Sequence, residues 1–336
     1  MKLSIGIVGL PNVGKSLLFN ILTKQQVNTA NYPFATIDPN VGVVPVPDER
    51  VDKLAGMSKS AKKIPAVIEF YDIAGLVKGA NKGEGLGNQF LSHIRDVSAI
   101  VQIVRCFESS EIIHVENSVD PVRDIDTINT ELILKDLETV EKRLAKLEGE
   151  ARTGDKQKIK EFEIVKKVHD ALNEERLAFD LEKEILEEIS VKELNLLTSK
   201  QQIYLLNGGE ENVSEELKNK IKSLNADYLV MDLASAQDLD ALIKKAYEIL
   251  NLISFLTTGE DETRAWTIID GWKAPQAAGV IHTDFEHKFI KAEVIHWEKL
   301  LEAGSWASAK QKGWLRLEGR EYPVKDGDVM VIKHSP

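Results

Sequence analysis

The chain has 336 residues, of which 43% are hydrophobic, and its 54 acidic residues against 43 basic ones give a net charge of −11. This length exceeds the about 100–200 residues of an ordinary domain, so two or three domains are expected, and the acidic balance excludes indiscriminate binding to DNA or an anionic membrane. Cys106 is the only cysteine and no apolar run approaches the roughly 20 residues of a membrane span, which predicts a reducing, cytoplasmic location without a signal peptide.

The first predicted element is a strand over Leu3 to Val8 that leads directly into a phosphate-binding loop, or P-loop. Residues 9–16 read GLPNVGKS and match G-x-x-x-x-G-K-[ST], and the apolar residues from Leu17 to Leu22 predict the helix that must follow. Backbone N–H groups of this motif point at phosphate oxygens, so we expect Lys15 at the β- and γ-phosphates and the Ser16 hydroxyl on Mg²⁺. The predicted phosphate ligands are Asn12, Val13, Gly14, Lys15, Ser16, Leu17 and Gly75.

Two further segments predict a switch of the GTPase type. Asp72 follows a predicted strand over Val67 to Tyr71, where its carboxylate can hold Mg²⁺ through water, and Gly75 can offer its N–H to the γ-phosphate. Thr36 falls in a polar loop, where its hydroxyl can complete the metal shell only while the γ-phosphate is present. The alternative for Thr36 is a loop hydroxyl that faces water.

Three more buried strands are predicted, over Ala99 to Val104, Gln202 to Leu206 and Tyr228 to Met231. Continuous apolar runs separated by helical stretches are typical of parallel strands that are buried on both faces. The expected fold class is therefore α/β, a P-loop NTPase of the GTPase type with a mostly parallel sheet and helices on both faces. This switch domain is expected to span 1–122 and 199–253.

The segment after Leu206 indicates which base the site binds. It reads Asn207-Gly208-Gly209-Glu210, where GTPases usually carry N-K-x-D. The aspartate of that motif accepts hydrogen bonds from the N1–H and 2-amino groups of guanine, which adenine lacks, so its loss removes the reason to prefer GTP. We expect ATP as the substrate, preferred over GTP or bound comparably. The residues expected near the base are Asn207, Gly208, Glu210, Ser235 and Ala236.

A helical insert is predicted between two of these strands. Apolar residues recur at steps of three and four from Ile125 to Leu147 and from Phe162 to Leu172, and the helical spacing returns at Leu181, Ile185 and Ile189. The pattern predicts an antiparallel helical hairpin over 123–198 with arms about 40 Å long. Because 34 of these 76 residues are charged, we expect a projecting coiled coil rather than an ordinary buried helix pair.

The sequence changes again from about Ser254, where short alternating runs with Gly and Trp predict a small, mostly β domain over 254–336. Four histidines in this part have spacings that fit no zinc site. Five tryptophans are expected in its core, with base-stacking platforms as the alternative: Trp266, Trp272, Trp297, Trp306 and Trp314.

Together these motifs resemble the Obg-like ATPases, the YchF family of the P-loop GTPase class, over essentially the whole chain. The resemblance rests on residues 9–16, 31–34, 72–76, 207–210 and 277–285. The last stretch, with 318–322 and 326–328, looks like a TGS domain of β-grasp type. The family implies ATP hydrolysis with Mg²⁺, a coiled-coil insert and a ribosome-associated role. The Gly208-Gly209 pair departs from the bulkier residues that are usual in the family.

The resemblance also implies how water is activated. Leu76 stands where many GTPases carry the glutamine that orients the attacking water, and an apolar side chain cannot do so. The family has a histidine in the loop that here contains His114, and an imidazole can orient water or accept a proton near neutral pH. A surface histidine is the alternative. Asn12 is a candidate K⁺ ligand, as similar GTPases with asparagine there suggest, and this ion would supply the charge of an arginine finger.

The leading hypothesis is a monomeric nucleotide switch that binds and slowly hydrolyses ATP and that, by the resemblance, regulates translation or a stress response on the ribosome. The catalytic residues are then His114 and Lys15. A small-molecule kinase and a nucleotide-binding adaptor that never hydrolyses are the alternatives, whereas DNA and membranes are not expected as partners.

The charges of the insert indicate how a net-acidic protein can meet RNA. Residues 135–167 carry 10 basic against 8 acidic residues, whereas 168–198 carry 3 against 9. A run of charged residues is usually only a solvated surface. A basic hairpin tip can, however, bind rRNA, so the expected partner is the large subunit or the whole ribosome, through its rRNA and proteins. The lysines near the turn are Lys156, Lys158, Lys160, Lys166 and Lys167.

Overall fold

The structure, a computed structural model, describes residues 4–24, 40–73, 94–109, 112, 114, 115 and 118–335. Three residues of the predicted switch, Thr36, Gly75 and Leu76, lie outside the described residues. The described residues form two compact units: the first within 1–24, 37–42 and 69–239, and the second within 43–68 and 240–336. Within the described ranges, no helix is long and apolar enough to cross a membrane.

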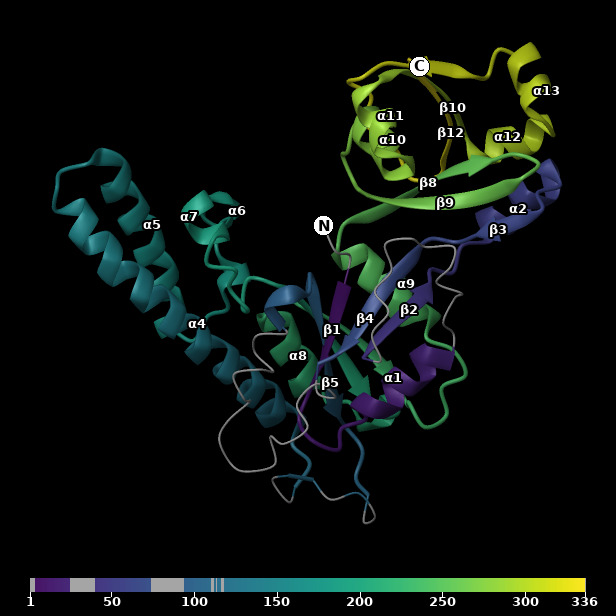
Figure 1. The fold of residues 1–336 in the computed structure, drawn as a ribbon. Helices are drawn as coiled ribbons and strands as arrows, with labels where there is room; N and C mark the ends of the chain where they lie inside the picture. The colour runs from purple at the N-terminus through teal and green to yellow at the C-terminus, as the bar shows by residue number, and fades with distance from the viewer. Residues whose placement is uncertain are drawn as a thin grey trace. The chain divides into compact units, whose positions relative to one another are not determined.

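The first sheet confirms the expected α/β class, with six strands in the order β2-β4-β1-β5-β6-β7 (Figure 1). Its strands are β1 (Ser4–Val8), β2 (Val41–Pro45), β4 (Val67–Asp72), β5 (Ala99–Arg105), β6 (Gln201–Asn207) and β7 (Asp227–Met231). The neighbours from β4 to β7 pair in parallel. Because β5 and β6 are buried along nearly their whole length, their sequences show no polar alternation.

Parallel pairing brings the carboxyl ends of several strands to one edge of this sheet. Ile7 of β1 is in register with Asp72 of β4, and Arg105 of β5 with Asn207 of β6. Helix α1 (Lys15–Lys24) follows β1 at this edge, and α8 (Glu215–Ser223) packs against β6 through Leu217 and other apolar residues. Open α/β sheets bind their ligands outside this edge.

The insert is a helical hairpin, as predicted. Its arms are α4 (Pro121–Ala151) and α5 (Lys156–Asn173), which lie side by side in Figure 1. Asp120 and Asp155 cap the two helices, because their carboxylates accept hydrogen bonds from backbone N–H groups of the first turns. The arms bury one apolar seam that includes Val140, Leu147, Val165, Val168 and Leu172.

The second arm is shorter than the sequence pattern predicts. After α5, Glu175 takes a left-handed backbone with φ of 60°, through which an α-helix cannot continue. A 3₁₀ turn (Ala178–Asp180) and two short helices, α6 (Lys183–Glu187) and α7 (Ile189–Lys192), follow instead. Ile185 still packs into the apolar seam, whereas Ile189 is 73% exposed. The helical spacing of Ile189 in the sequence therefore did not indicate that it is buried.

The second unit contains another six-stranded sheet, in the order β11-β10-β12-β8-β9-β3. Its strands are β3 (Lys62–Ile64), β8 (Leu252–Thr258), β9 (Glu262–Ile269), β10 (Phe289–His296), β11 (Arg316–Glu318) and β12 (Asp328–His334). Its helices are α2 (Glu49–Ser58), α9 (Asp240–Ile249), α10 (Ala274–Ile281), α11 (Thr283–His287), α12 (Trp297–Ala303) and α13 (Trp306–Gln311). β3 pairs with β9, so a segment from early in the chain completes this sheet.

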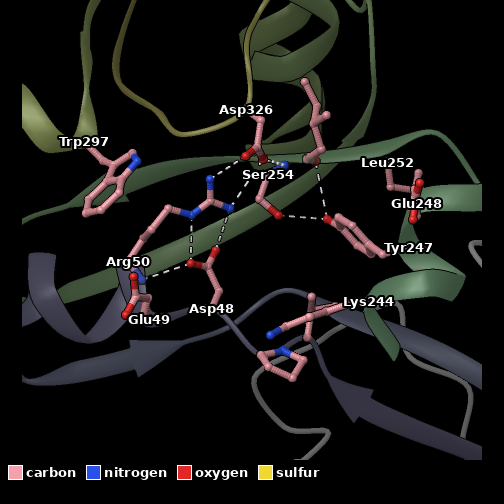
Figure 2. A pocket seen from close by; sticks show the side chains of 13 residues that line it. Asp48, Glu49, Arg50, Lys244, Tyr247, Glu248, Leu252, Ser254, Trp297 and Asp326 are labelled. Carbon is pink, nitrogen blue, oxygen red and sulfur yellow. Dashed lines mark hydrogen bonds and ion pairs between the residues drawn. The ribbon is translucent and has the colours of Figure 1, made fainter. Parts of the chain in front are cut away.

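An arginine links three segments of the second unit beside an open pocket (Figure 2). Arg50, in the first turn of α2, donates through Nε to Asp48 at 2.8 Å and through Nη1 to Asp326 at 2.6 Å. Asp326 in turn accepts from the backbone N–H of Ser254 in β8 at 2.9 Å. The pairs hold the start of α2 against the loop before β12.

The five tryptophans all lie in the second unit and are half-buried rather than enclosed. Trp266 and Trp272 pack against its apolar core, which agrees with the expected structural role for these two. Three tryptophan rings also carry a cation over one face: Lys53 over Trp297, Arg264 over Trp266 and Lys312 over Trp314.

A buried carboxylate ties α4 to the chain that returns to the sheet. Asp136 has no exposed surface, and it accepts from the backbone N–H groups of Leu197 and Thr198 at 2.9 and 2.8 Å and from the Thr198 hydroxyl at 2.7 Å. Burial raises the pKa of Asp136, against the opposing effect of these three hydrogen bonds.

We predict that Asp136→Ala lowers the free energy of unfolding by about 2–4 kcal/mol, because it leaves two buried N–H groups without an acceptor. Asp126→Ala, on the same helix, is the matched control, since Asp126 pairs with Lys220 at a partly exposed site and costs about 1 kcal/mol or less. Urea denaturation followed by circular dichroism measures both. Equal losses in the two variants would contradict the role given to Asp136.

Candidate nucleotide-binding site

The P-loop adopts the strained backbone that a phosphate cradle requires. Asn12 has φ of 62° and Gly14 has φ of 116°, both in the left-handed half of the map. A Cβ on Gly14 would come within 2.6 Å of the side-chain amide nitrogen of Asn207, so the loop needs glycine here for its backbone and for its space. Helix α1 starts directly afterwards, with the N–H of Leu18 donating to Gly14 at 2.9 Å.

The first turn of α1 carries the predicted phosphate and metal ligands. Ser16 and Leu17 are exposed, and the N–H groups of a first helical turn have no partner inside the helix. Lys15 is partly buried and donates from Nζ to the Leu10 carbonyl at 2.5 Å. Burial lowers the pKa of Lys15 to about 8, and the negative charge of Asp72 limits the shift.

Asp72 is the predicted metal carboxylate, and the structure places it close enough to Lys15 to influence its charge. It ends β4, is 8% exposed, and its backbone N–H donates to Asn40 at 3.0 Å. A carboxylate and the Ser16 hydroxyl are oxygen donors of the kind that Mg²⁺ selects, with phosphate and water as its other ligands. Within the described ranges, no cluster of three or more His, Cys, Asp or Glu residues forms a separate metal site.

Asn207, one of the predicted base residues, joins three segments of the site. Its Nδ2 donates to the carbonyl of Val13 at 2.8 Å, and its Oδ1 accepts from the backbone N–H of Leu233 at 3.1 Å. The side chain therefore joins the P-loop, the end of β6 and the loop after β7. Asn207 is 3% exposed, so these bonds are protected from water.

The other predicted base residues lie on two turns next to Asn207. Gly208 is buried and donates to Met231 at 3.2 Å, whereas Glu210 is exposed at the start of a 3₁₀ turn (Glu210–Asn212). Ser235 donates to the carboxylate of Asp232 at 2.8 Å. Ala236 is half-buried on the same loop. Sequence reasoning missed Asp232 and Leu233, which shape this loop but match no short motif.

His114 is not a surface residue, so the structure excludes that alternative. It is 5% exposed, and its Nε2 lies 2.8 Å from the Asp124 carboxylate in the first turn of α4. Arg105, at the end of β5, is 1% exposed and donates to the carbonyls of Phe107 and Ile112 in the same loop. Neither Asp124 nor Arg105 belongs to a motif that predicts a function for it. Arg105 could have been noticed in the sequence, because it is a single arginine at the end of an apolar strand.

The fold and the site together define a class. A G-x-x-x-x-G-K-S loop joins a buried parallel strand to a helix, and an aspartate ends the adjacent strand beside the P-loop lysine. This arrangement is that of a P-loop NTPase.

Comparisons with known proteins narrow the class to one family. Residues 4–140 match a model described as 50S ribosome-binding GTPase, and 252–335 match YchF-GTPase_C, described as a protein of unknown function. The chain is 47% identical to the ribosome-binding ATPase YchF of Bacillus subtilis and 44% identical to that of Pasteurella multocida, over the full length of every chain. It belongs to the YchF family.

A solved structure supports the same assignment. The Schizosaccharomyces pombe YchF GTPase is similar with a TM-score of 0.88 and 40% identity, over 99% of this chain and 98% of that one. The likeness therefore includes the P-loop domain, the helical hairpin and the small β unit that contains the TGS-like segment.

We predict that ATP affinity falls as the pH rises through about 8, because Lys15 then loses the charge that attracts the phosphates. The fall approaches about tenfold per pH unit above that value, and binding near pH 8 takes up a proton. Calorimetry in two buffers of different ionisation enthalpy measures both effects. Lys15→Arg keeps its charge and should lack this dependence, while a constant affinity of the natural protein across this range would contradict the prediction.

Proposed function

We propose that this protein is an ATP-hydrolysing switch that binds the ribosome in the cytoplasm and regulates translation or a stress response. The observation that carries the proposal is the P-loop at the sheet edge, where a partly buried Lys15 lies near Asp72. The names of the relatives, ribosome-binding ATPases at 44–47% identity over the full length, support both the reaction and the partner.

In the nucleotide complex, two tasks are divided among the P-loop, Asp72 and the two predicted switch residues Thr36 and Gly75. The phosphates are bound by the side chain of Lys15 and by N–H groups of the loop and of Gly75. Ser16, Asp72 and Thr36 would hold Mg²⁺, which would neutralise the charge that develops on the phosphate oxygens. Asn12 is proposed to hold K⁺ beside the β- and γ-phosphates. The described oxygen donors, a hydroxyl and a nearly buried carboxylate, suit the chemistry of Mg²⁺.

ATP is proposed as the nucleotide because the site lacks the guanine-reading aspartate. The Asn207 amide is already bonded to Val13 and Leu233, which leaves the exposed Glu210 carboxylate as the charged group at this position. Gly208, Ser235 and Ala236 form the adjoining backbone. A carboxylate can accept from the adenine 6-amino group, so Glu210 can bind ATP at this position.

Hydrolysis is proposed to use His114 to orient the attacking water. The apolar side chain of Leu76 cannot orient water. A histidine can accept a proton from water, and the contact of His114 with a carboxylate fixes the orientation of its ring. Lys15 stabilises the charge that develops on the transferred phosphoryl group.

We predict that ATP binds at least as tightly as GTP and is hydrolysed more slowly than about 1 per second, faster in K⁺ than in Na⁺ buffer. Equilibrium binding and phosphate release, with and without ribosomes, measure this. Glu210→Ala should change the ATP:GTP affinity ratio, whereas Glu211→Ala, an exposed neighbour, should not. A GTP preference of about tenfold would contradict the choice of nucleotide.

The same assay separates the alternatives. Phosphate transfer to a small acceptor without free phosphate would establish a kinase, and tight binding without turnover would establish an adaptor. Either result would overturn the proposed hydrolase.

The hairpin is proposed as the surface that meets rRNA. Of the five lysines near its turn, Lys156, Lys166 and Lys167 are exposed and have no ion pair among the described residues. In contrast, Lys158 pairs with Glu161 at 2.9 Å and Lys160 with Glu188 at 2.7 Å. The three unpaired lysines can therefore contact phosphates without first breaking a protein ion pair.

We predict that Ala at Lys156, Lys166 and Lys167 weakens ribosome binding and lowers the slope of log affinity against log salt by about 3, one for each lost phosphate contact. Cosedimentation at several salt concentrations measures the slope. The control is Ala at Lys158 and Lys160, whose side chains already pair with Glu161 and Glu188, and it should change the slope less. An unchanged slope in the triple variant would show that the hairpin tip does not bind rRNA.

A further inference from the structure

The loop that carries His114 is held at its start by a buried arginine. Arg105 is 1% exposed, and its Nε and Nη1 donate to the carbonyls of Phe107 and Ile112 at 2.9 Å each. Its guanidinium also lies over the Phe107 ring at 4.7 Å. A buried guanidinium is costly unless it is hydrogen-bonded, so these contacts hold Phe107 and Ile112 against the end of β5.

His114 itself is held by a buried carboxylate. The side chains of His114 and Asp124 are 3% and 4% exposed, and their Nε2 and Oδ2 atoms are 2.8 Å apart. The second oxygen of Asp124 accepts from Arg123 Nη2 at 3.0 Å. Because both oxygens are engaged, the carboxylate is fixed and in turn fixes the plane of the imidazole ring.

We propose that Asp124 is the positioning residue for His114 in ATP hydrolysis, an inference that rests on the proposed role of His114. A carboxylate accepts and does not donate, so the proton of neutral His114 lies on Nε2 and the lone pair on Nδ1. Asp124 thereby fixes the tautomer and the plane of the ring, and it stabilises the ring when His114 accepts a proton. Asp124 does not touch the nucleotide in this account.

The position of Asp124 gives the pair a structural consequence. It lies in the first turn of α4, which Asp120 caps and which continues for 31 residues into the hairpin. The orientation of the His114 ring is thus set by the helix that forms the first arm of the hairpin.

Steady-state ATP hydrolysis by four variants tests the proposal: His114→Ala, Asp124→Asn, the double variant, and Asp120→Asn as the matched control. Asparagine at 120 removes a charge from the same helix end but still caps the helix. We expect kcat to fall about tenfold or more in His114→Ala and Asp124→Asn with KM changed less than about twofold, and no further loss in the double variant. Asp120→Asn should stay within about twofold of the natural protein.

The outcomes distinguish the role of His114 in hydrolysis from the role of Asp124 in positioning His114. An unchanged kcat in His114→Ala would overturn the role of His114 and with it that of Asp124. A loss in His114→Ala without a loss in Asp124→Asn would overturn the positioning role alone. A further loss when Asp124→Asn is added to His114→Ala would show that Asp124 acts on something other than His114, and would also overturn it.

A spectroscopic measurement on the natural protein tests the positioning role of Asp124 even if the Asp124→Asn variant fails to fold. Nitrogen-15 spectra of the imidazoles, with the His114 signals assigned by their loss in His114→Ala, report which ring nitrogen carries the proton. The natural protein should show His114 protonated on Nε2, and Asp124→Asn should shift that signal. Protonation of His114 on Nδ1 in the natural protein would overturn the proposal.

Discussion

The parallel register of the first sheet is the constraint on which the site depends. Because β1, β4, β5 and β6 run in one direction, the P-loop, Asp72, Arg105 and Asn207 all meet at one edge although they are far apart in sequence. The Asn207 amide then closes this arrangement by bonding to Val13 on one side and Leu233 on the other. A glycine at position 14 is needed for the same closure, since a Cβ there would meet Asn207. The order and direction of the strands thus determine which side chains lie close enough to act together.

The sequence predicted this sheet well because its strands are unbroken apolar runs, and it predicted the P-loop because that motif combines a local backbone requirement with its two flanking elements. It predicted the hairpin from its helical period but overestimated the second arm, since the period persists at Ile189 after Glu175 has turned the chain. Contacts between segments distant in sequence carry no local pattern. The bond from Asn207 to Val13, the pairing of β3 with β9 and the link from Arg50 to Asp326 all belong to this group.

His114 shows how the structure changes the interpretation of a single residue. In sequence it was equally consistent with a surface histidine, because the surrounding loop is polar. In the fold it is buried against the first turn of α4, with Arg105 holding the other part of its loop. The helix that leads to the lysines of the hairpin tip therefore carries, in its first turn, the Asp124 carboxylate that contacts the imidazole. In the proposed switch, one helix connects the surface that binds the ribosome to the group that activates water.

The central claim is that the edge of the first sheet binds ATP with its metal. A crystal structure of the protein with Mg²⁺ and a non-hydrolysable ATP analogue tests it most directly. The account predicts that Lys15 contacts the β- and γ-phosphates, that the Ser16 hydroxyl ligates Mg²⁺ with Asp72 behind a bound water, and that Glu210 lies beside the adenine. A nucleotide bound elsewhere, or one whose metal ignores Ser16 and Asp72, would contradict it.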